Sequence, residues 1–229
     1  MVAPLVVFDL DGTLVDTAPD LVETLNVIFA REGLPPVDYA SARNMVGGGA
    51  RVMLERGLAA ECRVLPAAEV DRMVAEFIDY YAAHINDGSR LFPGVEAALD
   101  TLYARGFGLA VCTNKLEWLS VRLLYALGLS KRFVAICGQD TFNVAKPDPE
   151  ILRATIARAG GSPHAAIMVG DSIADIATAQ SAGIPVIAVD FGYSEQPVTE
   201  LHPDLVISRF ADLPEAVFGF HRPSARIRQ

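Results

Sequence analysis

Apolar runs without alternating polar positions recur along the chain and predict buried strands. Four of these runs are clear, and they are LVVF (5–8), GLAVCT (108–113), AAIMVG (165–170) and IPVIAV (184–189). FVAIC (133–137) and DLVIS (204–208) are weaker candidates. Runs rich in Val and Ile that lack alternation are typical of parallel strands covered on both faces.

Amphipathic helical patterns lie between these runs. They span residues 93–106, 117–128, 149–160 and 175–183, and each closes on a glycine or just before one. A glycine at this position is a common helix C-terminal signal. Strands that alternate with helices favour an α/β fold with a Rossmann-like parallel sheet and right-handed crossovers.

One long segment breaks this alternation. Between about Ala18 and Asn86 there is no convincing strand, and three segments have a helical period: 18–33, 41–58 and 67–85. We therefore predict an all-α domain at residues 17–88, inserted into an α/β core made of residues 1–16 and 89–229. The linkers are expected near Asp16–Thr17 and at 86–92.

Composition and charge argue against several classes of function. The chain has 229 residues, of which 52% are hydrophobic, and a net charge of −9. No basic stripe is present, which argues against nucleic acid as a partner. No apolar run approaches the ~20 residues of a membrane span, and the N-terminus lacks a secretion signal pattern. We expect a cytoplasmic monomer or homodimer that does not bind membranes, with a mobile basic tail at 221–229.

The three cysteines make no metal or disulfide pattern. Cys62, Cys112 and Cys137 are widely spaced and form no CxxC pair. Four scattered histidines form no pair typical of zinc sites. We expect reduced, buried thiols.

Polar residues follow several of the predicted strands. Asp9, Asp11 and Gly12 come after the first strand, and Thr113 and Asn114 close the second clear one. Lys146 follows the 133–137 run, and Asp171 and Asp175 follow 165–170. Because ligands of α/β sheets bind beyond the carboxyl ends of the strands, we expect these side chains to meet at one edge.

The acids indicate a bound cation. Asp9 and Asp11 are two positions apart, so an extended backbone points both to the same side. A strand-end turn would also explain them, whereas a calcium loop fails because Leu14 stands where glycine is required. Asp171 and Asp175 taken alone fit helix capping. Four carboxylates at neighbouring strand ends nevertheless need a positive charge, and oxygen ligands suit Mg²⁺.

Lys146, Thr113 and Asn114 supply groups that bind phosphate oxygens. An ordinary solvated lysine and simple turn chemistry are the alternatives. Together with the acids, the set suits phosphoryl transfer. An aspartate can attack phosphorus, and a second acid can protonate the leaving oxygen and later activate water.

In this order, DLDGTLVDT, TN, KP and GDSIAD resemble the four motifs of the haloacid dehalogenase superfamily. The resemblance implies Asp9 as nucleophile and Asp11 as general acid and base. It implies phosphate binding by Thr113 and Lys146, with Asn114 and Gly12 as further substrate-binding candidates. It also implies an Mg²⁺ ion held by Asp9, the Asp11 carbonyl and Asp171, with Asp175 nearby, and a helical cap over the site.

Within that superfamily, segments such as DTAPDL, RNMVGGGARVMLERGL and TNK resemble the phosphoglycolate phosphatase subfamily. The usual G-N-G of that subfamily is Gly47-Gly48-Gly49 here. A flexible hinge would explain the glycines. Alternatively, if the cap closes on the substrate, Arg43 and backbone N–H groups at Gly49 would meet a small carboxylate.

The leading hypothesis is an Mg²⁺-dependent phosphatase for a small phosphate ester, with phosphoglycolate first. A sugar phosphomutase on the same fold, or a phosphatase for pyrophosphate or a sugar phosphate, remains open. A dehalogenase is disfavoured. The resemblance implies that the dehalogenase branch of the superfamily lacks the second acid of the first motif, whereas this chain has Asp11 there. A non-enzymatic binding protein would require missing catalytic parts, and none is missing.

Overall fold

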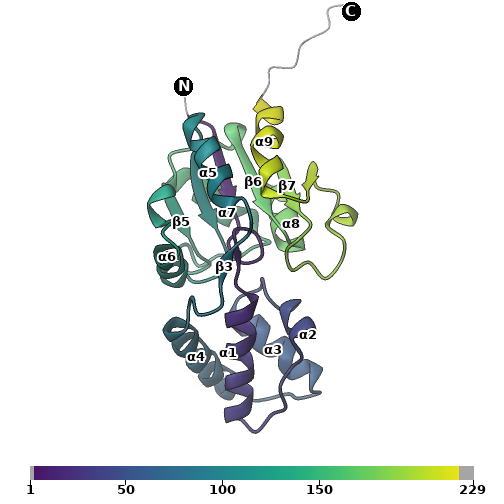
Figure 1. The fold of residues 1–229 in the computed structure, drawn as a ribbon. Helices are drawn as coiled ribbons and strands as arrows, with labels where there is room; N and C mark the ends of the chain where they lie inside the picture. The colour runs from purple at the N-terminus through teal and green to yellow at the C-terminus, as the bar shows by residue number, and fades with distance from the viewer. Residues whose placement is uncertain (1–2, 222–229) are drawn as a thin grey trace, which may run out of the picture.

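A six-stranded parallel sheet forms the centre of the upper part of the molecule (Figure 1). The structure is a computed structural model that describes residues 3–221. The strand order is β5-β4-β1-β6-β7-β8. The bounds are β1 Leu5–Phe8, β4 Gly108–Cys112, β5 Ala135–Cys137, β6 Ala166–Gly170, β7 Val186–Val189 and β8 Leu205–Ile207. All six predicted strands are therefore present, including the two weaker ones.

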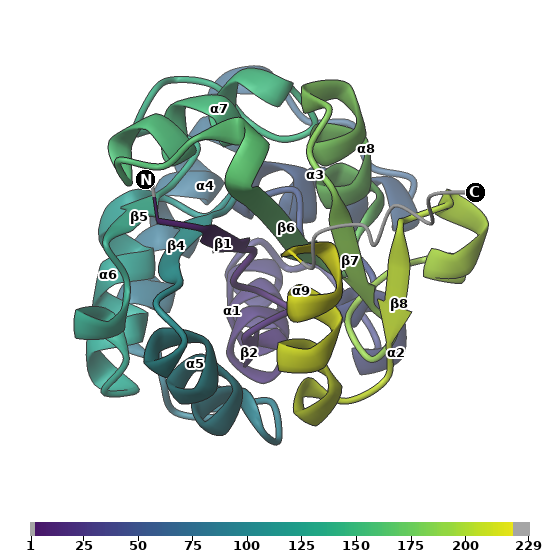
Figure 2. The same ribbon diagram turned by 90° about the horizontal axis from the view of Figure 1, so that it is seen from above.

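Helices cover both faces of this sheet (Figure 2). One face carries α7 (Pro149–Arg158) and α8 (Ile173–Ala182), and the other carries α5 (Val95–Ala104), α6 (Glu117–Ala126) and α9 (Leu213–His221). In β1, Val6 and Phe8 enter one apolar cluster, while Leu5 and Val7 enter the other. This two-sided burial explains why the strands read as unbroken apolar runs and confirms the α/β prediction.

Four helices form a separate layer below the sheet (Figure 1). They are α1 Ala18–Arg31, α2 Tyr39–Arg43, α3 Ala50–Ala60 and α4 Ala67–Ala83. We call this helical part the cap. The helix predicted over 41–58 is wrong in its middle, because residues 44–49 form no helix. Gly47 and Gly49 adopt φ of +111° and +88°, values that break a right-handed helix and that glycine tolerates.

The two predicted linkers are paired rather than loose. β2 (Val15–Asp16) runs antiparallel to β3 (Arg90–Leu91). Next to this pair, the Asp20 carboxylate accepts hydrogen bonds from the backbone N–H groups of Gly88 at 2.6 Å and Ser89 at 2.8 Å. The two chain crossings between core and cap are therefore tied to each other.

Smaller details differ from the sequence prediction. Helix α8 begins at Ile173 with Ser172 as its N-cap, so Asp175 lies in its first turn as the capping interpretation requires. Cys62 is exposed, contrary to the expectation, whereas Cys112 and Cys137 are buried as expected. Within residues 3–221, no helix has both the length and the apolarity to cross a bilayer. The basic tail is predicted at 221–229, but His221 ends α9, and the rest of that segment, 222–229, lies outside the described residues. Short 3₁₀ turns lie at Ser130–Arg132, Pro163–Ala165, Val198–Leu201 and Phe210–Asp212.

Candidate active site

The predicted site residues follow the carboxyl ends of neighbouring strands. Asp9 comes directly after β1, and its backbone N–H donates to the Val169 carbonyl of β6 at 2.9 Å. Asp171 comes directly after β6, and Thr113 directly after β4. Because β4, β1 and β6 are adjacent and parallel, their ends meet at one edge of the sheet. That edge faces the cap (Figure 1).

Three buried carboxylates gather at this edge. One carboxylate oxygen from each of Asp9, Asp171 and Asp175 lies within 4.8 Å of the others. The Lys146 ammonium lies 2.7 Å from Oδ1 of Asp9 and 2.6 Å from Oδ1 of Asp175. Asp9 is 3% exposed and Lys146 is 5% exposed, so the charges interact with little screening by water.

The carboxylates carry more negative charge than one lysine balances. Burial raises the pKa of Asp9 to about 7, although the Lys146 charge opposes this. Burial, together with the charges of Asp175 and Asp9, raises the pKa of Asp171 to about 8. Burial alone would lower the pKa of Lys146, but Asp175 and Asp9 raise it above its usual value. A divalent cation with oxygen ligands would fit this donor set.

Asp175 both caps a helix and contacts the lysine. Its Oδ2 accepts hydrogen bonds from Ser172 N at 3.0 Å and Ser172 Oγ at 2.6 Å. The Ser172 N–H bond and the bond that the Asp175 N–H donates to Ser172 Oγ at 3.4 Å together form a capping box at the start of α8. Its Oδ1 pairs with Lys146. The capping and functional interpretations of the sequence are therefore compatible at this residue.

Asp171 is fixed by neighbours that sequence reasoning did not assign. Thr13 Oγ1 donates to its Oδ1 at 2.7 Å, and the Tyr193 backbone N–H donates to its Oδ2 at 2.7 Å. Gly12 has φ +85°, and a Cβ there would lie 2.5 Å from Oδ2 of Asp171. The structure therefore places Gly12, a predicted substrate-binding residue, in close contact with a candidate metal ligand.

The Asp11 side chain lies apart from this acid cluster. Both of its carboxylate oxygens are 3.0 Å from Nζ of Lys115. Nζ of Lys115 also lies 4.4 Å from the ring centroid of Tyr81, which belongs to α4 of the cap. Burial alone would lower the pKa of Lys115, but the Asp11 charge raises it. The two acids of the first motif thus have different lysine partners.

Asn114 holds Lys146 and also contacts the cap. Its Oδ1 accepts from Lys146 N at 2.8 Å, and its Nδ2 donates to the carbonyls of Lys146 at 3.2 Å and Gly47 at 3.3 Å. Thr113 Oγ1 accepts from the backbone N–H of Lys115 at 3.2 Å. A Cβ at Gly49 would lie 3.2 Å from the Asn114 carbonyl oxygen. The segment Gly47-Gly48-Gly49, which we call the glycine loop, therefore lies directly against the core residues after β4.

Arg43 is not brought to the acid cluster. Its guanidinium donates to the carbonyls of Phe191 at 3.2 Å and Gly192 at 2.8 Å and lies 4.7 Å from the Tyr193 ring centroid. The Tyr193 hydroxyl donates to Oδ1 of Asp16 at 2.6 Å. In this structure Arg43 therefore joins α2 of the cap to the loop that supports Asp171.

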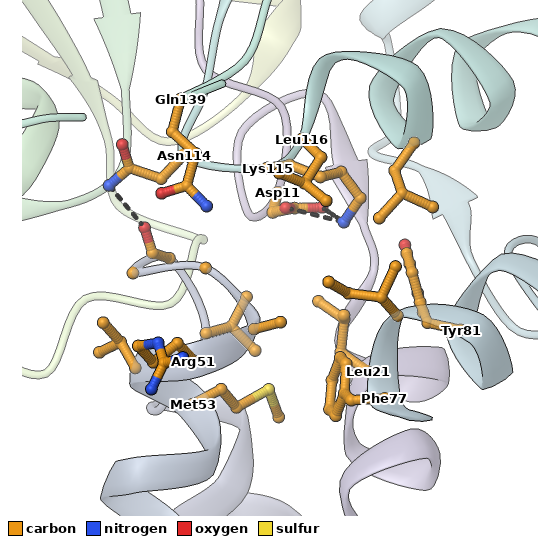
Figure 3. Close-up of a pocket in the computed structure, with 18 of the residues that line it drawn as sticks. Asp11, Leu21, Arg51, Met53, Phe77, Tyr81, Asn114, Lys115, Leu116 and Gln139 are labelled. Carbon is orange, nitrogen blue, oxygen red and sulfur yellow. Dashed lines mark hydrogen bonds and ion pairs between the residues drawn. The ribbon is translucent and has the colours of Figure 1, made fainter. Parts of the chain in front are cut away.

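A cavity of about 350 Å³ lies between cap and core (Figure 3). Asp11, Asn114 and Lys115 line its core side, while Met53 and Phe77 line its cap side. A second hollow of about 620 Å³ includes Lys146 and Ser172, and both hollows share Asn114 and the glycine loop.

The model of the haloacid dehalogenase-like hydrolases matches residues 6–189. The chain belongs to this family. It is 53% identical over 210 residues to a phosphoglycolate phosphatase of Mesorhizobium japonicum, with 92% of each chain covered. It is 50% identical over 216 residues to one of Agrobacterium fabrum, with 94% of this chain and 93% of that one covered.

A solved structure shares the architecture. A predicted phosphoglycolate phosphatase from Haemophilus somnus superposes with a TM-score of 0.87 at 32% identity, covering 93% of this chain and 97% of the other. The resemblance drawn from the motifs is therefore confirmed at the level of the family and the α/β fold. The residue roles stay predictions.

Sequence reasoning assigned no role to four residues that lie against the predicted ones. They are Thr13, Tyr81, Lys115 and Tyr193. Thr13 and the Tyr193 N–H donate to Asp171, while Lys115 contacts both Asp11 and the Tyr81 ring. Thr13 and Lys115 stand inside quoted motifs, which is a signal that could have been used. Tyr81 lies in a helical pattern with no local signal, so only the tertiary structure could find it.

Proposed function

We propose that the protein hydrolyses 2-phosphoglycolate to glycolate and phosphate through an aspartyl-phosphate on Asp9. The observation that supports the reaction class is the buried set of Asp9, Asp171 and Asp175 around Lys146 at the carboxyl edge of the sheet. The substrate rests on the 53% and 50% identity to proteins named phosphoglycolate phosphatase, which extends over nearly the whole chain.

In the first step, a carboxylate oxygen of Asp9 bonds to phosphorus while the bond from phosphorus to the glycolate oxygen breaks. The Asp11 carboxyl gives a proton to that leaving oxygen. In the second step, Asp11 takes a proton from water, and the water oxygen bonds to phosphorus as the Asp9 bond breaks. Lys146 and Thr113 would bind the phosphoryl oxygens throughout.

A divalent metal, Mg²⁺ in our proposal, would be held by Asp9, Asp171 and the backbone carbonyl of Asp11, with Asp175 beside it. The three buried carboxylates, together with the raised pKa values of Asp9 and Asp171, support a cation at this place. When bound, the ion offsets the repulsion between the carboxylates and the phosphate. The cytoplasmic location, the monomeric or homodimeric state and the domain boundaries at 16/17 and 88/89 stay predictions.

Phosphate release by the purified full-length protein tests the proposal. With Mg²⁺ we expect release from 2-phosphoglycolate, loss of release with EDTA, and loss in Asp9→Asn. A panel of sugar phosphates and pyrophosphate tests the alternatives in parallel. Undiminished release by Asp9→Asn would contradict the mechanism, and isomerisation of a sugar phosphate without phosphate release would contradict the substrate and reaction class.

A further inference from the structure

Lys115 brings a buried ammonium to the boundary between core and cap. Its side chain is 5% exposed, and its Nζ contacts both carboxylate oxygens of Asp11 at 3.0 Å. A lysine ammonium carries three donors. Two contacts to one carboxylate therefore leave Nζ the capacity to bind a further acceptor from the cavity that Lys115 lines.

Tyr81 presents an unused donor to the same place. The residue is 1% exposed and lines the cavity, and its hydroxyl lies beside the Lys115 ammonium but makes no hydrogen bond of ordinary geometry among the described residues. A buried polar group without a partner costs about 1–3 kcal/mol, so most are satisfied in native proteins. Figure 3 shows the Tyr81 hydroxyl directed toward the Lys115 side of the cavity. Both groups therefore offer hydrogen bonds to an acceptor that the protein does not supply.

The rest of the cavity offers little to an anion. Its lining in the described part of the chain is mainly apolar and includes Leu21, Met53 and Phe77. The other cation of the lining, Arg51, pairs with Asp71 and Glu55, and its side chain is 45% exposed. A small anionic group entering the cavity would meet Lys115 as its buried cation, with the polar groups of Tyr81, Asn114 and Gln139 around it.

We propose that Lys115 and Tyr81 form a subsite for the carboxylate of the substrate and select phosphate esters that carry this group. The inference rests on the proposed function. Lys115 lies two residues after Thr113, the predicted phosphate-binding residue, and its N–H donates to Thr113 Oγ1. In 2-phosphoglycolate a single carbon separates the ester oxygen from the carboxylate, so this close spacing suits a two-point hold. A carboxylate bound by both residues also joins cap and core.

The test compares 2-phosphoglycolate with 2-hydroxyethyl phosphate, in which a neutral hydroxymethyl group replaces the carboxylate. The readout is the ratio of their kcat/KM values in the full-length protein with Mg²⁺. We expect Lys115→Met to lower this ratio about 100-fold and Tyr81→Phe to lower it about 10-fold, in line with the value of a charged and a neutral hydrogen bond. Lys115→Arg keeps the charge and should retain most of the ratio.

Arg51→Met is the matched control, because it removes a cation from the same cavity and should leave the ratio within about twofold. Equal falls of both kcat/KM values in Lys115→Met and Lys115→Arg would overturn the subsite, since they indicate a structural role. If the wild-type protein released no phosphate from 2-phosphoglycolate, the proposed function would fail together with the subsite. Wild-type hydrolysis with an unchanged ratio in Lys115→Met would overturn the subsite alone.

Discussion

The backbone N–H of Tyr193 donates a hydrogen bond to Oδ2 of Asp171 at 2.7 Å, while the ring of the same tyrosine lies under Arg43 of the cap. Its hydroxyl also accepts from Ala18 N at 2.9 Å, where α1 begins, and donates to Asp16 in β2. One residue thus contacts a candidate metal ligand, the core–cap crossing and the cap itself.

We expect Tyr193→Phe to lower the free energy of unfolding by about 1–3 kcal/mol, because Asp16 and the Ala18 N–H lose a buried partner. Denaturant unfolding should show this loss of stability. The kcat value should also fall, but by a proportionally smaller amount. Tyr125→Phe is the control, since Tyr125 is 76% exposed and its loss of a hydroxyl should change neither quantity. Equal stability of the two variants would contradict the role of Tyr193.

Substitutions of Asp11 and Asp171 should differ in their effects on Mg²⁺ binding. Asp11→Asn should abolish most turnover while Mg²⁺ binding remains, because only the Asp11 backbone carbonyl is proposed as a ligand and its side chain contacts Lys115. Asp171→Asn should weaken Mg²⁺ binding, because its carboxylate belongs to the acid cluster. The shift of the melting temperature with Mg²⁺ concentration measures binding in both variants. Loss of that shift in Asp11→Asn would count against the assignment.

Lys146 should be required for both charge balance and catalysis. Lys146→Met leaves Asp9 and Asp175 without their buried cation, so we expect kcat to fall about 10²–10³-fold. Lys131→Met is the control because Lys131 is exposed on the surface. Steady-state phosphate release measures both variants. A variant with Met at 146 that keeps normal turnover would exclude Lys146 from the reaction.

Substitutions at Gly12 and Gly33 form a matched pair, because they separate an effect on the metal site from backbone strain. Both adopt positive φ, +85° and +66°, but a Cβ meets Asp171 only at Gly12 and meets nothing within 4 Å at Gly33. Gly33→Ala should cost about 1–2 kcal/mol of stability from backbone strain alone. Gly12→Ala should cost more and also weaken Mg²⁺ binding, measured by calorimetric titration. Unchanged Mg²⁺ affinity in Gly12→Ala would show that Asp171 tolerates the displacement.

The stability of the metal-free protein should fall as pH rises. Asp9 and Asp171 have pKa values of about 7 and about 8 in the folded state, against an ordinary value of 3.8. Their protonated forms therefore favour the folded state, and this contribution is lost as pH rises from about 4 to about 8. We expect a lower melting temperature at pH 8.5 than at pH 5.5 in EDTA, and a larger gain from Mg²⁺ at pH 8.5. A gain that is equal at both pH values would argue against a cation at these acids.

Much of the site could be predicted from local patterns. Unbroken apolar runs marked β1, β4, β6 and β7 because strands buried on both faces need apolar side chains at every position. Parallel strands end at one edge, so Asp9 and Asp171 could be placed together before any coordinates were known. The order of the motifs then led to the family.

The tertiary structure decided which charge faces which. The sequence could not show that Lys146 pairs with Asp9 and Lys115 with Asp11, because those contacts depend on loop paths after β4 and β5. It could not show that Arg43 contacts the Phe191–Tyr193 loop, since this contact joins residues 148 and 149 positions apart in the chain. Patterns along a chain report which surfaces are buried, whereas the buried pairs of Lys146 with Asp9 and of Lys115 with Asp11 join residues more than a hundred positions apart.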